Sequence, residues 1–267
     1  MKNKIILSSG SLYNYGLNRF FELAKKSGFD KIELCPDFRI DTQDSKYIKK
    51  LEQEYRIKVI ALHYMMEFFG VWGDYKERIT KSIRLAKNIK SKYLILHSWE
   101  YNDPEYNNYV LRNQNKIAET AQPVQIVFEN STKSFDPESP KKVLTDCFSP
   151  EYMNRFNNVL MDTSHVATAK LDLVKFYNKL NGKIKYIHFS DNDFSPRKDR
   201  PNSIEDSHLA PGYGKLPLKK FLKHLGSTKY QGIISIELMP SSIGAEKGEK
   251  VVLKNLISAR KFVEKHL

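Results

Sequence analysis

The sequence predicts an α/β protein with the (β/α)₈ TIM barrel fold, formed as a single domain over residues 1–267. Three observations lead to this prediction. Eight short apolar runs recur along the chain, amphipathic helical patterns separate them, and side chains of metal-binding types follow six of the runs in succession. A length of 267 residues suits one barrel of this kind, in which each of eight parallel strands is followed by a helix.

The eight apolar runs are the expected strands. They are rich in β-branched residues and continuous rather than alternating, which is typical of parallel strands covered on both faces. They lie at residues 5–7, 31–34, 59–62, 93–96, 124–128, 159–161, 184–187 and 233–236.

Apolar stripes at helical spacing fill intervals between the runs. They are clearest at residues 20–24, 79–86, 218–225 and 252–263. Gly28 and Gly226 are expected to close two of these helices, because glycine adopts the left-handed conformation that often ends a helix. Alternating strands and helices predict a parallel sheet. A doubly wound open sheet is the alternative, but Ser8-Ser9-Gly10-Ser11 lacks the nucleotide-binding glycine pattern, and the even spacing favours a closed barrel.

Charge and cysteine content limit the class of protein. The formal net charge of +13 favours anionic partners such as phosphorylated sugars or nucleic acid, although a general bias towards lysine explains it equally. Two cysteines, Cys35 and Cys147, make no disulfide framework. No stretch has the ~20 apolar residues of a membrane span, and the first apolar run is too short for a signal peptide. We therefore expect a cytoplasmic protein with no membrane partner.

Side chains that can bind metal follow the expected strands. The carboxyl ends of the strands form one face of a barrel, and the chemistry is placed there. Six successive strands end in His, Asp or Glu, and further candidates lie just beyond the sixth strand and in the long loop of residues 191–214. The full set is His63, His97, Glu129, Asp162, His165, His188, Asp206, His208 and Glu237.

This concentration of side chains predicts a divalent-metal site. Five of the seven histidines belong to the set, whereas His224 and His266 lie on expected helices. Carboxylates and imidazoles crowded at one barrel mouth would repel one another or lie unsatisfied without a cation. Mixed imidazole and carboxylate ligands suit Zn²⁺ or Mn²⁺, with Co²⁺, Fe²⁺ and Mg²⁺ as alternatives.

The segments around these residues form a recognisable set. They are Leu62-His63, Leu96-His97, Phe128-Glu129-Asn130, Met161-Asp162-Thr163-Ser164-His165, Ile187-His188-Phe189-Ser190-Asp191-Asn192, the stretch 206–214, and Ile236-Glu237-Leu238. Together they resemble the xylose isomerase-like barrels, and the resemblance covers the whole chain. That superfamily includes sugar-phosphate isomerases and epimerases, the tagatose 3-epimerase group and the AP endonuclease family 2, to which the DNA-repair enzyme endonuclease IV belongs.

The epimerase branch of this superfamily implies one metal held by Glu129, Asp162, His188 and Glu237. The resemblance implies that the two glutamates flank the substrate and pass a proton between adjacent carbons, while the metal polarises the neighbouring carbonyl. His165 would contact the substrate or a second metal. We therefore expect an isomerase or epimerase that acts on a sugar, a sugar phosphate or a related polyol ketone through an enediolate, with Glu129, Glu237 and His165 as catalytic residues.

Endonuclease IV implies another function for the same residues, since its three zinc ions use nine ligands that all have counterparts here. The segments with which that nuclease reads DNA do not match. They are replaced by Tyr64-Met65-Met66-Glu67, Ser98-Trp99-Glu100 and Asn130-Ser131-Thr132-Lys133. An abasic-site nuclease is therefore the second hypothesis. A barrel that keeps metal only for stability is the third.

The candidates for substrate contacts are His63, Trp99 and Arg197. Trp99 follows the fourth strand, where it could shape access to the site or serve packing alone. Arg197 lies in the long loop and could bind a substrate phosphate, for which arginine is well suited; a solvated charged loop is the alternative. The aromatic and methionine side chains of residues 64–72 could line the pocket or form a lid. The oligomeric state is left open.

Overall fold

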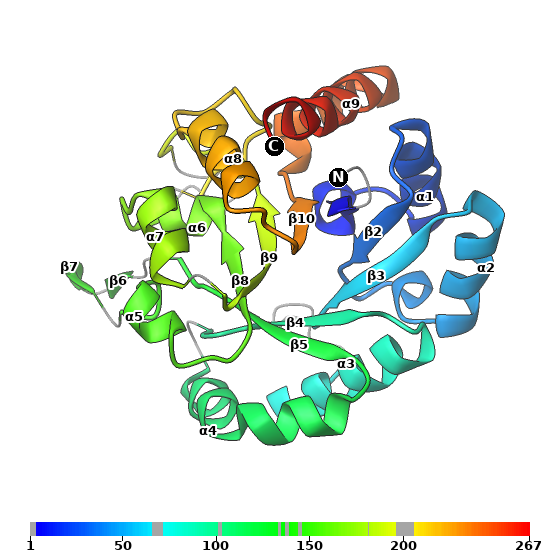
Figure 1. Cartoon of the computed structure of the whole chain (residues 1–267). Helices are drawn as coiled ribbons and strands as arrows, with labels where there is room; N and C mark the ends of the chain where they lie inside the picture. Colours follow the sequence, from blue (N-terminus) through cyan, green and yellow to red (C-terminus); the bar gives the residue numbers. More distant parts are fainter. Residues whose placement is uncertain are drawn as a thin grey trace.

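The eight apolar runs form the strands of a closed parallel barrel in the computed structural model, so the predicted fold class is confirmed (Figure 1). Around the barrel the strands follow the order β1-β10-β9-β8-β5-β4-β3-β2. Their bounds are β1 (Ile5–Ser8), β2 (Lys31–Leu34), β3 (Lys58–His63), β4 (Tyr93–His97), β5 (Gln125–Glu129), β8 (Val159–Asp162), β9 (Ile184–Phe189) and β10 (Ile233–Ile236). The structure describes residues 4–65, 72–100, 103–132, 146–180, 182–195 and 206–267, with the backbone of 135–136 and 139–143.

The helices surround the barrel and bury one apolar face against it (Figure 1). They are α1 (Leu17–Lys26), α2 (Ser45–Tyr55), α3 (Tyr75–Asn88), α4 (Pro104–Ala121), α5 (Pro150–Met153), α6 (Thr163–Thr168), α7 (Leu173–Lys179), α8 (Leu218–Ser227) and α9 (Glu249–His266). Aspartates begin several of them, as Asp74 does by accepting a hydrogen bond from the Glu77 backbone amide at 2.9 Å. Within the described residues, no helix is long and apolar enough to cross a membrane.

Strand periodicity brings the predicted site residues to the inner face of the barrel. The interior is filled by a buried apolar cluster: Ile6, Ala61, Tyr93, Ile95, Val127, Leu160, Tyr186 and Ile233. Alternate residues of a strand share a face. Five of these apolar residues are followed, two positions later in the same strand, by a residue of the expected site. The pairs are Ala61 and His63, Ile95 and His97, Val127 and Glu129, Leu160 and Asp162, and Tyr186 and His188. These five residues therefore form the next inward-facing layer, at the carboxyl ends of the strands.

Two local features differ from the sequence-based expectation. Gly226 lies inside α8 and does not close it, because the helix continues to Ser227 and Lys229 takes the left-handed conformation at φ 54°. Gly28 does adopt φ 84°, just after α1. An antiparallel pair, β6 (Phe135–Asp136) and β7 (Ser139–Val143), lies between β5 and β8 along the chain and outside the barrel sheet. Its sequence lacks an apolar run, so the criterion that found the barrel strands does not detect it.

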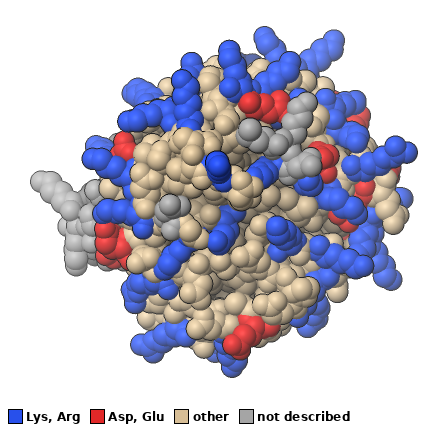
Figure 2. All heavy atoms as spheres, viewed as in Figure 1, with Lys and Arg blue, Asp and Glu red and all other residues tan. Residues whose placement is uncertain are grey.

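The basic surface is dispersed. Figure 2 shows Lys and Arg side chains spread over the face viewed, with few Asp and Glu among them. On this face the positive charge does not gather into one patch, which agrees with a general bias towards lysine.

Candidate metal centre

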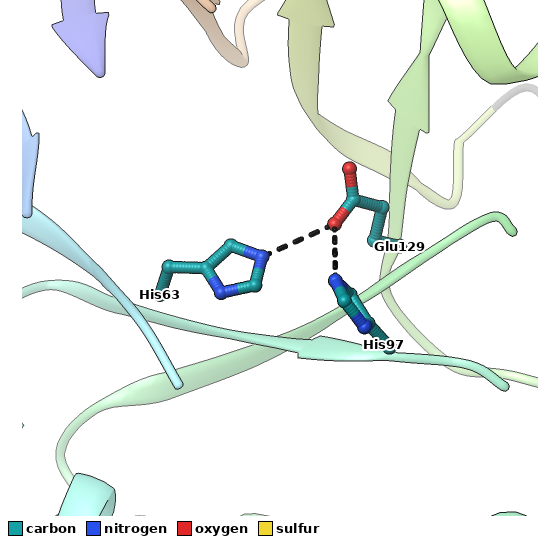
Figure 3. Close-up of side chains that lie close together, drawn as sticks. All are labelled: His63, His97 and Glu129. Carbon is teal, nitrogen blue, oxygen red and sulfur yellow. Dashed lines mark hydrogen bonds and ion pairs between the residues drawn. The ribbon is translucent and has the colours of Figure 1, made fainter. Parts of the chain in front are cut away.

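His63, His97 and Glu129 meet at the ends of β3, β4 and β5 (Figure 3). The two histidines point towards the same carboxylate oxygen. The Nε2 atoms of His63 and His97 lie 3.3 and 3.5 Å from Oε2 of Glu129. One ligand atom from each residue lies within 4.8 Å of the others, so a single cation could be bound by all three.

The other oxygen of Glu129 belongs to a second group, the core cluster of Glu129, Asp162, His188 and Glu237. The Nδ1 atom of His188 lies 2.8 Å from Oε1 of Glu129 and 2.9 Å from Oε2 of Glu237. It is 3.7 Å from Oδ2 of Asp162. The four candidate ligand atoms lie within 4.8 Å of one another. Glu129 therefore connects the first group to the core cluster through its two carboxylate oxygens.

A third group joins Asp162 to His165 and His208, again with ligand atoms within 4.8 Å. Asp206 lies beside it, because its carboxylate oxygens are 3.6 Å from Nε2 of His165 and 3.1 Å from Nε2 of His208. All nine residues that the sequence singled out are thus brought together. Eight of them form three adjoining groups, linked by Glu129 and Asp162, and Asp206 lies beside the third.

Asp162 provides a direct test of whether a cation fits. Its side chain is fully buried, and Oδ1 accepts a hydrogen bond from the His165 backbone amide at 2.8 Å, which begins α6. Its other oxygen, Oδ2, is buried with no hydrogen-bond partner among the described residues. An unsatisfied buried carboxylate oxygen is costly. A metal ion bound by the core cluster would satisfy it, so the residues present fit a divalent cation.

The histidines support the same interpretation, because four of the five have one ring nitrogen within hydrogen-bonding distance of a group outside the three clusters, and His97 has Glu100 nearby. Such outer contacts orient the ring and fix which nitrogen is free to bind metal. The contacts are His63 Nδ1 to the Tyr64 carbonyl (3.0 Å), His97 Nδ1 to Glu100 (3.6 Å), His165 Nδ1 to the Asn130 carbonyl (2.7 Å), His188 Nε2 to Glu33 (3.0 Å) and His208 Nδ1 to Ser190 (3.3 Å). Four histidines therefore present Nε2 to the centre, whereas His188 presents Nδ1.

Opposite charges dominate the electrostatics of the metal-free centre. Burial raises the pKa of Glu129, but the positive charge of His188 holds that pKa well below its usual range. Burial lowers the pKa of His208, but the carboxylates of Asp206 and Asp162 raise it to about 9. Burial, followed by repulsion from His63, lowers the pKa of His97 to about 3. Without a metal, protons on His188 and His208 balance the carboxylates.

Two outer carboxylates complete the centre. Glu33, on β2, is fully buried and contacts His188, although in the sequence it is predicted only as part of a strand. A charged residue inside an apolar run was the signal that could have identified it. Glu100, which follows Trp99, lies 3.6 Å from His97 and 3.4 Å from Arg78.

The expected substrate contacts have different positions. His63 lies in the first group and is 3% exposed. Trp99 is half-buried and packs against the core directly after β4, beside the site. Arg197 lies outside the described residues. Tyr64, Met65 and Trp72 are buried in the core, so this part of the 64–72 segment packs inward.

The long loop after β9 is anchored by Asp191. Its carboxylate accepts hydrogen bonds from the backbone amides of Gly212 at 2.8 Å and Leu216 at 3.0 Å. Its backbone pairs with Leu209 through two 2.8 Å hydrogen bonds. This anchoring fixes where the chain returns from the loop, next to Asp206 and His208.

Histidines and carboxylates gather at the carboxyl ends of six strands of this parallel barrel. These features define the class of protein as a TIM barrel with a candidate metal site. The chain belongs to the xylose isomerase-like TIM barrel family, whose model matches residues 21–257. The family resemblance drawn from the sequence is therefore confirmed.

Individual relatives are distant in sequence, and those named here cover between 82% and 99% of this chain. An uncharacterized protein of Mycobacterium leprae (strain TN) is 24% identical over an alignment of 288 residues, gaps included; the alignment covers 97% of this chain and 98% of that protein. Fructoselysine 3-epimerase of Shigella flexneri is 22% identical over 249 residues, covering 82% and 84%. The solved structure of D-psicose 3-epimerase with D-tagatose, from Clostridium cellulolyticum H10, matches with a TM-score of 0.70 at 13% identity and covers 99% of each chain.

Proposed function

We propose that this barrel is a divalent-metal-dependent isomerase or epimerase that acts on a sugar, a sugar phosphate or a related polyol ketone. The observation that carries the proposal is that two glutamate carboxylates, those of Glu129 and Glu237, both approach His188 Nδ1, at 2.8 and 2.9 Å. The sugar 3-epimerases among the relatives and structural matches support the same chemistry.

Glu129, Asp162, His188 and Glu237 would hold the metal, with Zn²⁺ and Mn²⁺ the best candidates from the donor set. When bound, the metal would polarise the substrate carbonyl. Glu129 and Glu237 would exchange the proton, one removing it from the carbon next to the carbonyl and the other returning it to the opposite face or the neighbouring carbon. The side chain of Glu129 is 2% exposed and that of Glu237 is 20% exposed, so Glu237 faces the opening.

We further propose that His165 contacts a substrate oxygen or a further metal ion, and that His63, Trp99 and Arg197 contribute to substrate binding. The half-buried position of Trp99, two residues after His97 in the chain, supports its assignment. Arg197 is assigned on sequence alone, for binding the phosphate of a phosphorylated substrate.

A second function is favoured by one observation. The three adjoining groups use eight of the nine residues that correspond to the ligands of endonuclease IV, and Asp206 lies beside the third group, so three ions could be held. A zinc-dependent nuclease acting at abasic sites is therefore the alternative. The segments after His63, His97 and Glu129 differ from those with which that nuclease reads DNA, which favours the sugar reaction.

Solvent exchange tests the first proposal. Metal-loaded protein should incorporate deuterium from heavy water into at least one member of a panel of ketoses, ketose phosphates and inositol ketones, at the carbon next to the carbonyl. Glu129→Gln and Glu237→Gln should each reduce the incorporation by about 10²–10⁴-fold, while the surface control Glu151→Gln should retain it. Incision of an abasic duplex by zinc-loaded protein, with no exchange across the panel, would instead establish the nuclease.

A further inference from the structure

Glu33 is a carboxylate buried inside the barrel, where charged side chains are rare. It lies on β2, which contributes none of the nine expected ligands. Oε1 accepts a hydrogen bond from Ser8 Oγ at 2.9 Å and a longer one from Cys35 Sγ at 3.5 Å. Oε2 accepts from the Tyr186 hydroxyl at 2.5 Å and faces His188 Nε2 at 3.0 Å.

Three of the four partners of Glu33 are hydroxyl or thiol donors, and the fourth is Nε2 of His188, which donates when it carries the ring proton. Both of its oxygens are therefore occupied, which argues against Glu33 itself as a metal ligand, although its carboxylate lies within reach of Cys35 and Glu237. The arrangement suits an ionised carboxylate, since an ionised carboxylate only accepts hydrogen bonds. Glu33 is thus placed to act on the metal centre through His188.

The two nitrogens of His188 face opposite ways. Nε2 faces Glu33, and Nδ1 faces the carboxylates of Glu129 and Glu237. A ring that donates from Nε2 to Glu33 keeps the Nδ1 lone pair for a metal. We propose that Glu33 is a positioning residue that fixes the tautomer and orientation of His188, so that this histidine binds the core metal through Nδ1. The inference rests on the proposed metal dependence and assigns a residue beyond the nine ligands.

The contact is distinctive within the centre. Among the residues that the structure describes, His188 is the only one of these five histidines with a carboxylate outside the three groups within 3.5 Å of its second nitrogen. Glu100 lies 3.6 Å from His97, and the others contact carbonyl or hydroxyl oxygens. A negatively charged acceptor raises the basicity of the ring more than a neutral one does, and such outer partners typically contribute 10–100-fold in metal affinity. The four-ligand core would therefore depend on Glu33 although Glu33 does not touch the metal.

Metal affinity, measured by competition with a chromophoric chelator for Zn²⁺ and for Mn²⁺, tests the proposal independently of activity. Glu33→Ala should weaken binding by about 10–100-fold. Glu33→Gln should weaken it less, because the amide oxygen can still accept from Nε2 while the amide nitrogen donates to Ser8 Oγ. Tyr186→Phe is the matched control, since it removes another buried hydrogen bond to the same oxygen; its affinity should stay within about twofold of wild type.

Long-range ¹H–¹⁵N spectra of the Zn²⁺-loaded protein provide a second readout, which needs no Glu33 variant to fold. His188 should bind through Nδ1 and keep its proton on Nε2. Binding through Nε2, or equal metal affinity in wild type and both Glu33 variants, would overturn the role of Glu33 and leave the proposed function standing. A wild-type protein that binds neither metal would overturn both. Loss of affinity on changing Glu33, in a protein without sugar exchange, would support this inference and count against the proposed reaction alone.

Discussion

Metal-free protein should become less stable as the pH rises from 6.5 to about 9, because His208 loses its proton in this range. Burial lowers the pKa of His208, but Asp206 and Asp162 raise it from 6.5 to about 9. A histidine whose folded-state pKa lies above its unfolded value contributes stability below the unfolded pKa. That contribution is lost as the pH rises through the folded value.

The shift sets the magnitude of the loss. Moving a pKa from 6.5 to about 9 corresponds to roughly 3 kcal/mol of unfolding free energy, at about 1.4 kcal/mol per pKa unit. His208 is 7% exposed, so solvent screens its ion pair with Asp206 only weakly. The pKa values of Glu129 and Asp206 are lowered, so these carboxylates are ionised in both the folded and the unfolded protein above about pH 5. They therefore do not contribute to the change in stability between pH 6.5 and 9.

Urea unfolding of chelator-treated protein at pH 6.5 and 9 measures the effect. His208→Gln should reduce the loss of unfolding free energy between pH 6.5 and 9 by roughly 3 kcal/mol. Comparison of the variant with wild type separates the effect of His208 from that of other groups. One such group is Glu100, because its burial and the charge of Asp103 raise its pKa to about 8. Added Zn²⁺ should stabilise the protein more at pH 9 than at pH 6.5, because histidine must be deprotonated to bind metal. Equal slopes in wild type and His208→Gln would refute the assigned ion pair.

Three further predictions concern the ligands. Glu129→Gln should lower the metal content and reduce any proton-exchange activity by about 10²–10⁴-fold, measured by elemental analysis and deuterium incorporation; unchanged exchange would remove Glu129 from the reaction. Asp162→Asn should lower Zn²⁺ affinity by more than ~10-fold while α6 still forms, because asparagine can still cap this helix but supplies no charged oxygen to the metal. Asp172→Asn at the start of α7 is its control, and a parallel loss of affinity there would refute the assignment. Zn²⁺ binding at pH 7 should release protons from the three ligand histidines whose pKa values are raised, which calorimetry in buffers of different ionisation enthalpy measures; proton uptake would contradict it.

Much of the fold and the site follows from strand periodicity. Parallel strands have carboxyl ends on one face of a barrel, so residues such as His97 and Glu129 could be placed together from the sequence. The structure adds how they meet. Glu129 contacts two groups, one through each of its carboxylate oxygens. This arrangement depends on the directions of side chains, which the spacing of residues along the chain does not determine.

The contacts that sequence reasoning missed are those between distant segments with no motif of their own. Glu33 and His188 are 155 residues apart, and a lone glutamate in an apolar run does not reveal which side chain it will face. The end of α8 was mispredicted for a local reason, since Lys229 adopts the left-handed conformation expected of Gly226.

The central claim is that Glu129, Asp162, His188 and Glu237 bind a divalent metal together. Anomalous diffraction from crystals of the purified protein, recorded on both sides of the zinc and manganese absorption edges, tests it most directly. The prediction is a metal peak among these four side chains, with Asp162 Oδ2 and His188 Nδ1 at about 2.0–2.2 Å from it. Crystals grown with either metal in excess that show the four side chains ordered and no peak between them would contradict the claim.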